Sequence, residues 1–462
     1  MPKKKLCVLG GGGVRSIFVA RTIARAAAEL NLGSVVFFDV DAAKLKSYGG
    51  LAKEVARRIS PDLEFTLETD AKKAIEIADY IITTVRVGGD ASRVKDEEII
   101  SNLGLLAQET TGAGGFSMAM RSIPVISAYC QLAKEIAAPG HIILNFTNPA
   151  GLVTQALVDQ GFPAFGICDS PLELIGQLSE MLNVSRDRFS CNSFGLNHLT
   201  WFNEFEVDGK SVSKDLLSDP ALFTSTEMRI FDPKILDISE GHLLNEYLYF
   251  YHYNKKAIAM FEASTPSRGD LIATVNKAMN AELSGVNVES DFDTALEIFF
   301  RNYNVRENNY MKNESGKARP KVREVPSVEE FVNGNDEGGY AGVAVNFIKA
   351  FESSAPAEMV LSTRNNGAIA GLEANDVVEV MCTVSNEVVK PRPQKNIPKT
   401  IFNLIATMKE YERLSVQAIL SKDKNLAVKA LMTNPLVANF DLASKLVTEF
   451  VTRNSQDSGE WK

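Results

Sequence analysis

A glycine-rich turn between two apolar runs is the feature that most constrains what this chain can fold into. Residues 5–9 form a short apolar run that stops at four consecutive glycines, residues 10–13, and apolar residues with helical spacing follow at residues 17–24. A second apolar run, residues 35–38, ends at Asp39. The order strand, glycine turn, helix, strand and acidic residue is typical of a dinucleotide-binding βαβ unit.

Each part of this pattern has a physical role in holding a dinucleotide. Glycines let the backbone approach a pyrophosphate, and the N-terminus of the following helix offers unpaired N–H groups and a positive dipole. A carboxylate at Asp39 can accept hydrogen bonds from both ribose hydroxyls and would repel a 2′-phosphate, which favours NAD over NADP. Arg15 stands where the third glycine of the fingerprint belongs, so a plain tight turn is the alternative. The expected cofactor contacts in this segment are Gly10, Gly11, Gly12, Gly13 and Asp39.

Apolar runs and helical patterns continue to alternate along the next part of the chain. Strands are expected at residues 80–84, 141–146 and 164–168, and helices at residues 71–78, 121–138 and 151–160. Strands separated by helices predict a parallel, doubly wound sheet, in which ligands bind outside the carboxyl ends of the strands. The polar residues that follow these strands are Arg86, Asn148, Cys168 and Asp169.

The pattern changes after the last of these strands. An extended stretch at residues 193–207 leads into a mixed region, with helices expected at residues 401–414 and 425–431. At roughly 150 residues per domain, the length allows two or three domains. We therefore expect an α/β protein with a Rossmann-like dinucleotide-binding domain at residues 1–190. A second α/β domain at residues 191–462 is expected to pack against it and form a cleft.

Charge and composition exclude several classes of partner. Acidic residues outnumber basic ones by 58 to 49 and no long run of Lys and Arg occurs, so a nucleic-acid partner is not expected. No run of about 18 apolar residues occurs, so neither a membrane span nor a membrane partner is expected, and the N-terminus lacks a signal-peptide pattern. The five Cys are scattered and predict no disulfide framework. We expect a protein of the cytoplasm.

Two residues carry side chains suited to a transition metal. Cys168 ends an expected strand on the ligand side of the sheet, and His198 lies in the segment 195–199. A thiolate and an imidazole together could hold a divalent transition metal and leave positions for substrate oxygens and water. Taken singly, a Cys at a strand end more often belongs to the core, and a lone His is more often a satisfied polar residue. Spacing alone leaves both interpretations open.

Several arginines and an aromatic segment are further candidates. Arginine suits bidentate capture of phosphate or carboxylate, although a single arginine more often forms a surface ion pair. Residues 245–253 are unusually aromatic, which is typical of a helix face packed on the core. One tyrosine there could still act as a base if a cation lowers its pKa. The candidate arginines are Arg86, Arg93, Arg121, Arg268 and Arg364.

Together these residues resemble the NAD- and metal-dependent glycoside hydrolases of family 4, and within that family the 6-phospho-β-glucosidases. The resemblance runs from about residue 4 to about residue 440, and a chance match of six segments in the family's order is not expected. The segments are residues 86–89 (Arg-Val-Gly-Gly), 108–116 (Gln-Glu-Thr-Thr-Gly-Ala-Gly-Gly-Phe), 145–151 (Asn-Phe-Thr-Asn-Pro-Ala-Gly), 195–199 (Gly-Leu-Asn-His-Leu), 245–248 (Asn-Glu-Tyr-Leu) and 363–367 (Thr-Arg-Asn-Asn-Gly).

The resemblance implies a metal and a base. Cys168 and His198 match the family's metal ligands, usually for Mn²⁺. Tyr247 matches the tyrosine taken as the base, and Asp169, beside the metal cysteine, is included with it as an expected catalytic residue. The implied fold is a dinucleotide-binding domain plus a second α/β domain, related to lactate and malate dehydrogenases.

The resemblance also implies the substrate and cofactor contacts. Arg93 and Arg268 match arginines near the substrate's 6-phosphate. Asn148 and Asn197 are the expected contacts to the sugar, and Arg86 joins Asp39 and the glycines among the expected contacts to NAD. The implied partners are a small phosphorylated disaccharide or glycoside and further copies of this chain, in a dimer or tetramer.

The implied activity is hydrolysis of a 6-phosphorylated glycoside by a redox and elimination route. NAD⁺ takes a hydride from C3, the metal stabilises the enolate, and a tyrosinate removes the C2 proton. The aglycone then leaves from C1, water adds, and NADH returns the hydride.

Alternatives to this activity remain open. Phospho-β-glucosidases usually have Cys-Asn-Val-Pro at the metal cysteine and phospho-α-glucosidases have Cys-Asp-Met-Pro, whereas residues 168–171 here are Cys-Asp-Ser-Pro. The α or β anomer is therefore undecided, although the other segments look more like the β group. Other activities of family 4, an NAD-dependent dehydrogenase of a hydroxy acid or sugar, and a non-catalytic NAD- or sugar-phosphate-sensing protein are the remaining alternatives.

Overall fold

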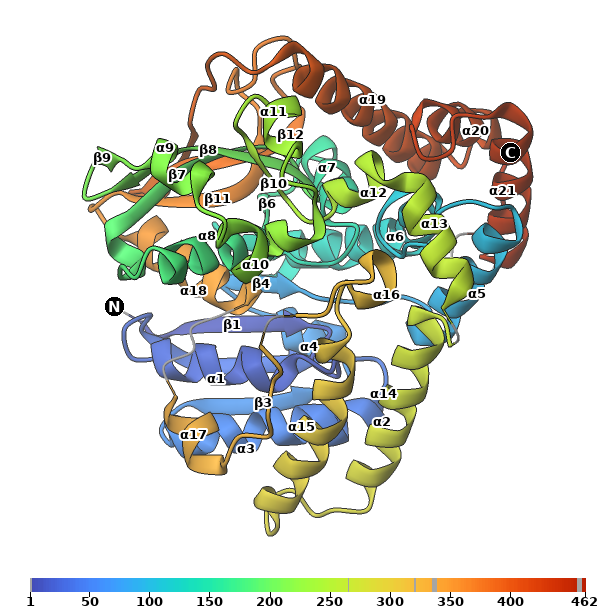
Figure 1. The fold of residues 1–462 in the computed structure, drawn as a ribbon. Helices are drawn as coiled ribbons and strands as arrows, with labels where there is room; N and C mark the ends of the chain where they lie inside the picture. The colour runs from blue at the N-terminus through green and yellow to red at the C-terminus, as the bar shows by residue number, and fades with distance from the viewer. Residues whose placement is uncertain (1, 265, 320, 335–338, 455–458) are drawn as a thin grey trace.

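One continuous sheet runs through the protein (Figure 1). The computed structural model describes residues 2–264, 266–319, 321–334, 339–454 and 459–462, and within these ranges thirteen strands join this sheet. The strands are β1 (Lys4–Leu9), β2 (Leu32–Phe38), β3 (Glu64–Glu68), β4 (Tyr80–Thr83), β5 (Ile142–Asn145), β6 (Ala164–Gly166), β7 (Phe189–Leu196), β8 (Leu199–Val207), β9 (Lys210–Ser211), β10 (Leu243–Leu244), β11 (Ala357–Arg364), β12 (Val377–Ser385) and β13 (Val388–Pro391).

The N-terminal half of the sheet is parallel. Its strands lie in the order β3-β2-β1-β4-β5-β6, and every neighbouring pair is parallel. This is the strand order of a doubly wound dinucleotide-binding sheet. Strands β1, β4 and β5 are apolar runs buried on both faces, as parallel strands covered by helices must be. The predicted parallel sheet is therefore confirmed, and the ends of its strands differ from the expected ones by a few residues.

The sheet continues beyond β6 with antiparallel strands. β11 pairs with β6, and β12, β7, β8 and β10 follow in that order. The extended stretch expected at residues 193–207 is a hairpin of β7 and β8. The expected division at residue 190 falls one residue after β7 begins, and strands from both sides of it share the sheet. The boundary between two domains therefore stays a prediction.

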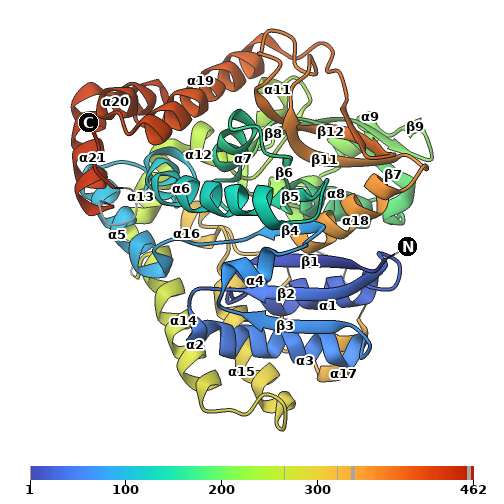
Figure 2. The same ribbon diagram turned by 180° about the vertical axis from the view of Figure 1, so that it is seen from behind.

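Helices cover both faces of the parallel half. α1 and α3 lie together on one face, and α4, α6 and α7 lie on the other (Figures 1 and 2). The helices are α1 (Ser16–Ala26), α2 (Ala42–Lys44), α3 (Gly50–Ile59), α4 (Ala71–Ile75), α5 (Gly89–Asn102), α6 (Gly112–Ile136), α7 (Ala150–Asp159), α8 (Ser170–Met181), α9 (Ser213–Ser218), α10 (Leu222–Ser225), α11 (Ile235–Ile238), α12 (Leu248–His252), α13 (Asn254–Ala263), α14 (Arg268–Ser284), α15 (Phe292–Asn308), α16 (Lys312–Ser315), α17 (Val328–Asn333), α18 (Tyr340–Glu352), α19 (Lys399–Ser421), α20 (Lys424–Thr433) and α21 (Phe440–Arg453).

Most helices expected from the sequence are present with altered ends. α6 begins nine residues before the expected residue 121, because the glycine-rich segment at its start is helical. α5, α14 and α15 were not expected. Helix α5 carries many charged residues and no clear apolar stripe, so periodicity gave no signal for it.

A second hydrophobic cluster fastens the α14–α15 hairpin to the dinucleotide-binding unit. Phe18 of α1 meets the rings of Phe299, Phe300 and Tyr303 of α15 at centroid distances of 5.8, 5.8 and 5.1 Å. Leu51 and Val55 of α3 belong to the same cluster. The hairpin therefore runs alongside β1–β3 (Figure 1), and the C-terminal end of α15 is directed to the edge where the parallel strands end.

No helix in the described ranges has both the length and the apolar character needed to cross a bilayer.

Replacing Phe299 with Ala should destabilise the fold. Its ring is fully buried, so Phe299→Ala should lower the free energy of unfolding by about 3–5 kcal/mol, measured by denaturant titration. The matched control is Phe440→Ala, because Phe440 is 62% exposed, and a change within about 0.5 kcal/mol is expected there. Equal effects of the two substitutions would contradict the role of the second cluster.

Candidate active site

The glycine turn after β1 lies against the loop that follows β4. Gly10 has a φ of +105°, and a Cβ atom there would lie 2.3 Å from the carbonyl oxygen of Thr84. The amides of Gly10 and Gly11 both donate to the carbonyl oxygen of Phe38, at 2.9 and 2.8 Å. These contacts join the ends of β1, β2 and β4 at one edge of the sheet.

Asp39 faces the same turn. The Gly12 amide donates to Asp39 Oδ2 at 3.0 Å, and a Cβ atom on Gly12 would lie 2.8 Å from that oxygen. The structure thus brings the predicted ribose carboxylate and the glycine turn together. Gly13 completes the turn, since its amide donates to the Gly10 carbonyl oxygen at 3.0 Å.

Arg15 connects the glycine turn with the end of β6. Its guanidinium forms an ion pair of 2.7 Å with Asp169 Oδ2, and the two side chains are 36% and 27% exposed. The residue in place of the third glycine therefore contacts a predicted catalytic residue that lies 154 positions away.

Cys168, His198 and Tyr247 come from three different segments. Cys168 follows β6, His198 lies in the turn between β7 and β8 with a φ of +62°, and Tyr247 precedes α12. The rings of His198 and Tyr247 stack with centroids 3.7 Å apart and planes 3° apart. The Tyr247 amide donates to Asn245 Oδ1 at 2.9 Å, which fixes the backbone at the tyrosine.

The charges around these residues suit a bound cation. Burial raises the pKa of the Cys168 thiol, and the nearby carboxylates of Glu379 and Asp169 raise it further. Burial lowers the pKa of His198 to about 4, although Asp169 and Glu109 oppose the shift, so the imidazole is neutral at pH 7, and its Nδ1 lies 3.4 Å from Thr110 Oγ1. An excess of negative charge beside a thiol and a neutral imidazole fits a divalent transition metal.

Cys168 and His198 would supply one sulfur ligand and one nitrogen ligand to a metal. In the described part of the chain, no group of three or more His, Cys, Asp and Glu side chains is arranged to hold a metal ion. A metal at Cys168 and His198 would therefore take its other ligands from a bound molecule or water. Burial also raises the pKa of Tyr247, and the neighbouring Glu246 carboxylate raises it further, so the phenol keeps its proton when no cation is near.

The predicted sugar contacts, Asn148 and Asn197, both have hydrogen bonds within the protein. The side-chain Nδ2 of Asn197, the residue before His198, donates to Glu379 Oε2 at 3.0 Å. Thr200 Oγ1 donates to Glu379 Oε1 at 2.8 Å. Asn148 follows β5, and its Oδ1 accepts from the Ala150 amide at 3.3 Å. Both asparagines are half-buried.

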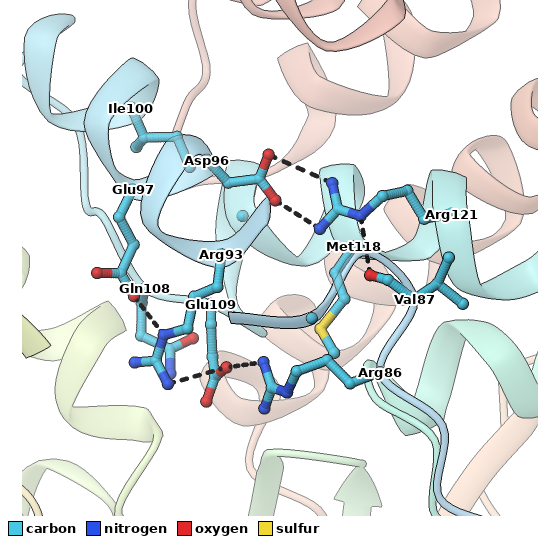
Figure 3. A pocket seen from close by; sticks show the side chains of 12 residues that line it. Arg86, Val87, Arg93, Asp96, Glu97, Ile100, Gln108, Glu109, Met118 and Arg121 are labelled. Atoms are coloured by element: carbon cyan, nitrogen blue, oxygen red, sulfur yellow. Dashed lines mark hydrogen bonds and ion pairs between the residues drawn. The ribbon is translucent and has the colours of Figure 1, made fainter. Parts of the chain in front are cut away.

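A pocket between α5 and α6 is lined by three of the candidate arginines, Arg86, Arg93 and Arg121 (Figure 3). Glu109 Oε2 pairs with Arg86 at 2.6 Å and with Arg93 at 3.1 Å, and Arg93 also pairs with Glu97 at 2.7 Å. Burial would raise the pKa of Glu109, but the guanidinium groups of Arg86, Arg93 and Arg268 hold it well below its ordinary value. One carboxylate thus lies among three arginines.

Arg268 joins this cluster from α14. Its guanidinium donates to the carbonyl oxygen of Arg306 at 2.9 Å, and the adjacent Gly269 amide donates to Glu97 Oε2 at 3.0 Å. Arg268 is 7% exposed, and within the described ranges it forms no ion pair with a carboxylate. Glu109 acts on the pKa values of both His198 and Tyr247, so the arginine cluster adjoins the stacked pair.

The other two candidate arginines are engaged in structural contacts. Arg121 pairs with Asp96 at 2.7 Å on the far wall of the pocket (Figure 3). Arg364 donates to the carbonyl oxygen of Val158 at 3.2 Å, at the end of β11.

Three residues of this region were not assigned a role from the sequence. Glu109 lies in residues 108–116, one of the six segments that resemble family 4. That membership is the sequence signal that could have indicated a role for it. Glu246 directly precedes Tyr247, and burial beside Glu227 and Glu173 raises its pKa to about 8. Tyr310 follows α15, donates to Glu246 Oε1 at 3.2 Å and carries no sequence signal at all.

Two family models match the chain. The model described as Family 4 glycosyl hydrolase matches residues 5–184, and the model described as Family 4 glycosyl hydrolase C-terminal domain matches residues 193–437. The two matches meet in the segment that contains the start of β7.

Curated relatives match over the whole chain. The 6-phospho-beta-glucosidase BglT of Thermotoga maritima is 27% identical over 455 residues, covering 98% of this chain and 99% of that protein. The phospho-alpha-glucosidase PagL of Clostridium acetobutylicum is 27% identical over 482 residues, covering 100% and 99%. These two relatives, one named for each anomer, thus have the same sequence identity to this chain.

Solved structures share the fold. The 6-phospho-beta glucosidase of Thermotoga maritima, solved with manganese, NAD⁺ and glucose-6-phosphate, superposes with a TM-score of 0.80 at 25% identity, covering 98% of this chain and 99% of that one. Malate dehydrogenase from Naegleria fowleri superposes with a TM-score of 0.52 at 12% identity, covering 91% and 99%. The expected α/β fold related to malate dehydrogenase is therefore confirmed.

Removing the Glu109 charge should destabilise the protein at neutral pH. Glu109→Gln leaves Arg86 and the buried Arg93 without their shared carboxylate, so the free energy of unfolding at pH 7 should fall by about 1–3 kcal/mol. Because the folded-state pKa of Glu109 is depressed, its contribution is complete above the unfolded pKa of about 4.3 and is lost as the pH falls below that value.

Denaturant titrations at several pH values test this. The gap between Glu109→Gln and the unsubstituted protein should be constant from pH 7 to about 5 and shrink below about 4.3. The control is Glu98→Gln, on the exposed face of α5, which should change little. A gap that widens on acidification would contradict the assigned sign.

Proposed function

This chain belongs to the family 4 glycosyl hydrolases, and from that membership we propose that it hydrolyses 6-phosphorylated β-glucosides with NAD and Mn²⁺ or another divalent transition metal. The observation that carries the choice of a phosphorylated substrate is the group formed by Arg86, Arg93 and Arg268 beside the stacked pair of His198 and Tyr247. The relatives named as phosphoglucosidases and the related structure with NAD⁺, manganese and glucose-6-phosphate support it.

The phosphate is proposed to take the position between the arginines. Arg268 is buried, and its guanidinium lies close enough to Glu109 to lower the pKa of that carboxyl, so a phosphate bound beside it would accept charge-assisted hydrogen bonds from it. Arg93 donates to Glu97 Oε1, and the Gly269 amide donates to Glu97 Oε2, so Glu97 joins Arg93 to the residue after Arg268. A 6-phosphate bound there would place the sugar ring toward His198 and Tyr247.

The glycine turn and Asp39 are proposed to hold the nucleotide. The positive dipole at the N-terminus of α1 would favour the pyrophosphate, and Asp39 would accept hydrogen bonds from the ribose. Its negative charge opposes a 2′-phosphate, so NAD is the proposed cofactor. Arg86 directly follows Thr84 and Val85, whose backbone atoms lie next to Gly10, and its predicted contact with the cofactor is part of this proposal.

The proton at C2 of the sugar is the one that the chain's own residues must move. Bound NAD would supply a reversible hydride acceptor and a bound divalent cation a Lewis acid, and together they would make the C2 proton acidic. Cys168 and His198 would hold the cation, and Asn148 and Asn197 would orient the sugar. Tyr247 Oη would remove the C2 proton, the aglycone would leave C1 with a proton, and water would add at C1. A proton would then return to C2 and the hydride to C3, so that no net NADH forms.

Asp169 is proposed to act beside this centre through its ion pair with Arg15. Arg15 lies in the glycine turn, and Asp169 directly follows Cys168. The ion pair therefore fixes the distance between the nucleotide and the sugar. Assembly as a dimer or tetramer and action in the cytoplasm, where imported phosphorylated sugars appear, are further parts of the proposal.

The main alternative is the α anomer. It is favoured by the residue after the metal cysteine, which is Asp169, as in the phospho-α-glucosidases to which the sequence is similar. Parallel assays with the α and β anomers of nitrophenyl 6-phosphoglucoside, NAD⁺ and Mn²⁺ separate the two, because the favoured anomer should release nitrophenol faster.

Turnover in D₂O tests the proposed reaction directly. Hydrolysis should place deuterium at C2 of the released sugar 6-phosphate, detected by NMR, because the C2 proton exchanges with solvent during turnover. Nitrophenol should appear without net NADH, and chelation of the metal should stop the reaction. Deuterium absent from C2 would reject the elimination route, and steady accumulation of NADH would indicate a dehydrogenase instead.

Replacing Arg268 should weaken binding of the phosphate specifically. Arg268→Ala removes a charge-assisted contact worth about 1.5–3 kcal/mol, so kcat/KM for the phosphorylated glycoside should fall by about 10- to 150-fold. The non-phosphorylated glycoside should lose much less. The control is Arg364→Ala, whose guanidinium lies at the end of β11, and an equal loss on both substrates would point to misfolding rather than to phosphate recognition.

A further inference from the structure

The turn between β7 and β8, which carries His198, has an unusual backbone conformation. Leu196 pairs with Leu199, so Asn197 and His198 are the two loop residues of the hairpin. Only the second of them has a positive φ, which is +62° at His198. The favoured two-residue hairpin turns have a positive φ at the first loop residue, because that conformation follows the twist of the strands. The conformation at His198 therefore depends on contacts from outside the hairpin.

A single buried carboxylate, that of Glu379 on β12, contacts the chain on both sides of His198. Asn197 Nδ2 donates to Glu379 Oε2 at 3.0 Å, and Thr200 Oγ1 donates to Glu379 Oε1 at 2.8 Å. Thr200 Oγ1 also lies 2.9 Å from the Leu196 carbonyl oxygen, so its one proton is shared between two acceptors. Glu379 is 2% exposed, and it therefore connects the turn to the buried part of the sheet.

The order of the strands places Glu379 between the two predicted metal ligands. β12 and β11 lie between β7, which leads to His198, and β6, which leads to Cys168. Glu379 is in register with Gly195 on β7 and with Ser362 on β11. Cross-strand partners share one face of a sheet, so a glycine and a serine flank the longer glutamate side chain and leave it room to reach the turn. The sheet thus fixes the carboxylate, and the carboxylate fixes the turn.

Glu379 also determines which end of the Asn197 amide is free. The Nδ2 group donates to Glu379, whereas Oδ1 accepts no hydrogen bond from any residue in the described ranges. An amide oxygen accepts and does not donate, so Asn197 offers an acceptor to the hydroxyl of a bound sugar. A Cβ atom on Gly151 would lie 3.5 Å from Asn197 Cβ, which places Asn197 beside the segment that carries Asn148. The two predicted sugar contacts therefore come from adjoining segments.

The ring of His198 has other neighbours, but they do not hold the turn itself. The ring stacks on Tyr247 with centroids 3.7 Å apart, and its Nδ1 lies 3.4 Å from Thr110 Oγ1. A stacked ring can slide in its own plane, and a polar contact of that length is weak. Metal–ligand distances are held to within about 0.2 Å. A small displacement of the turn would therefore weaken the bond between the imidazole and a metal.

We propose that Glu379 is a positioning residue for the site: it holds the β7–β8 turn so that the His198 imidazole can bind the metal and the Asn197 amide oxygen can accept a hydrogen bond from the sugar. This inference rests on the proposed function, in which His198 binds the metal and Asn197 contacts the sugar. Glu379 acts through the turn, because each of its oxygens already accepts a hydrogen bond from a residue within two positions of His198.

Glu379→Leu tests the inference, because leucine keeps much of the volume and removes both acceptors. Loss of a contact that orients a metal ligand costs about 10- to 100-fold in metal affinity, so the dissociation constant of Mn²⁺ should rise by that factor. Titration of the NAD⁺-loaded protein with Mn²⁺, followed by the EPR signal of free Mn²⁺, measures this without turnover. The dissociation constant of NAD⁺ should not change.

The same variant tests the contact with the sugar. At saturating Mn²⁺, KM for nitrophenyl 6-phosphoglucoside should rise by about 2- to 12-fold, because Asn197 loses its fixed orientation and one hydrogen bond to the substrate weakens.

Two matched variants separate positioning from charge and from a general effect of the substitution. Glu379→Gln keeps the contacts, because its Oε1 can accept from Asn197 while its Nε2 donates to Thr200, whose proton then goes to Leu196. It should therefore retain most of the Mn²⁺ affinity. Glu358→Leu makes the leucine substitution on the neighbouring strand β11, at a side chain that is 50% exposed, and should leave Mn²⁺ affinity unchanged.

Several results would overturn the inference. Equal losses of Mn²⁺ affinity in Glu379→Leu and Glu379→Gln would show that the charge acts directly, and unsubstituted affinity in Glu379→Leu would show that the contact does not matter. An equal loss of NAD⁺ and Mn²⁺ affinity would indicate a general structural effect.

A further variant keeps the test decisive if Glu379→Leu does not fold. Thr200→Val removes one of the two contacts at nearly constant volume, so it should raise the dissociation constant of Mn²⁺ and leave that of NAD⁺ unchanged. Unchanged Mn²⁺ binding in this variant would also overturn the inference. Failure of the unsubstituted protein to bind Mn²⁺ or to release nitrophenol would instead reject the proposed function.

Discussion

The parallel pairing of β1, β4, β5 and β6 is the constraint on which the site depends. Hydrogen bonds in register place the carboxyl ends of these strands along one edge of the sheet. The segments that leave this edge contain Gly10, Asn148 and Cys168, which lie up to 158 residues apart in the sequence. These strands are apolar and covered by helices on both faces, so the edge belongs to the buried core of the sheet. Polar chemistry can therefore be placed in the loops without weakening the core.

Charge is divided between two neighbouring regions of the site. Carboxylates surround Cys168, whereas three arginines surround Glu109. A metal cation suits the first region and a phosphate suits the second, and a phosphorylated sugar holding both would span them. Glu109 contacts the arginines and also acts on the pKa values of His198 and Tyr247, so it couples the two regions electrostatically. The division also explains why a buried arginine and a buried acidic group can coexist a short distance apart.

The α14–α15 hairpin contributes to the site although it packs on the outer side of the dinucleotide-binding unit. Its aromatic cluster with Phe18 fixes the hairpin, and its two ends carry Arg268 and the residues that precede Tyr310. The position of Arg268 and the contact of Tyr310 with Glu246 therefore both depend on the packing of this hairpin. Polar residues separate the apolar positions of α14 and α15 in the sequence, so hydrophobic spacing alone did not indicate either helix.

Sequence alone determined the alternation of strands and helices, the parallel sheet, the glycine turn with Asp39, and the candidates Cys168, His198 and Tyr247, because strand pattern, turn chemistry and motif order are local properties. Tertiary structure decided the rest. The stacking of His198 on Tyr247, the pairing of Arg15 with Asp169, and the contact of Tyr310 with Glu246 join residues from 49 to 154 positions apart or from separate elements. Such contacts follow from how the strands and the hairpin pack, and no local pattern of residues encodes them.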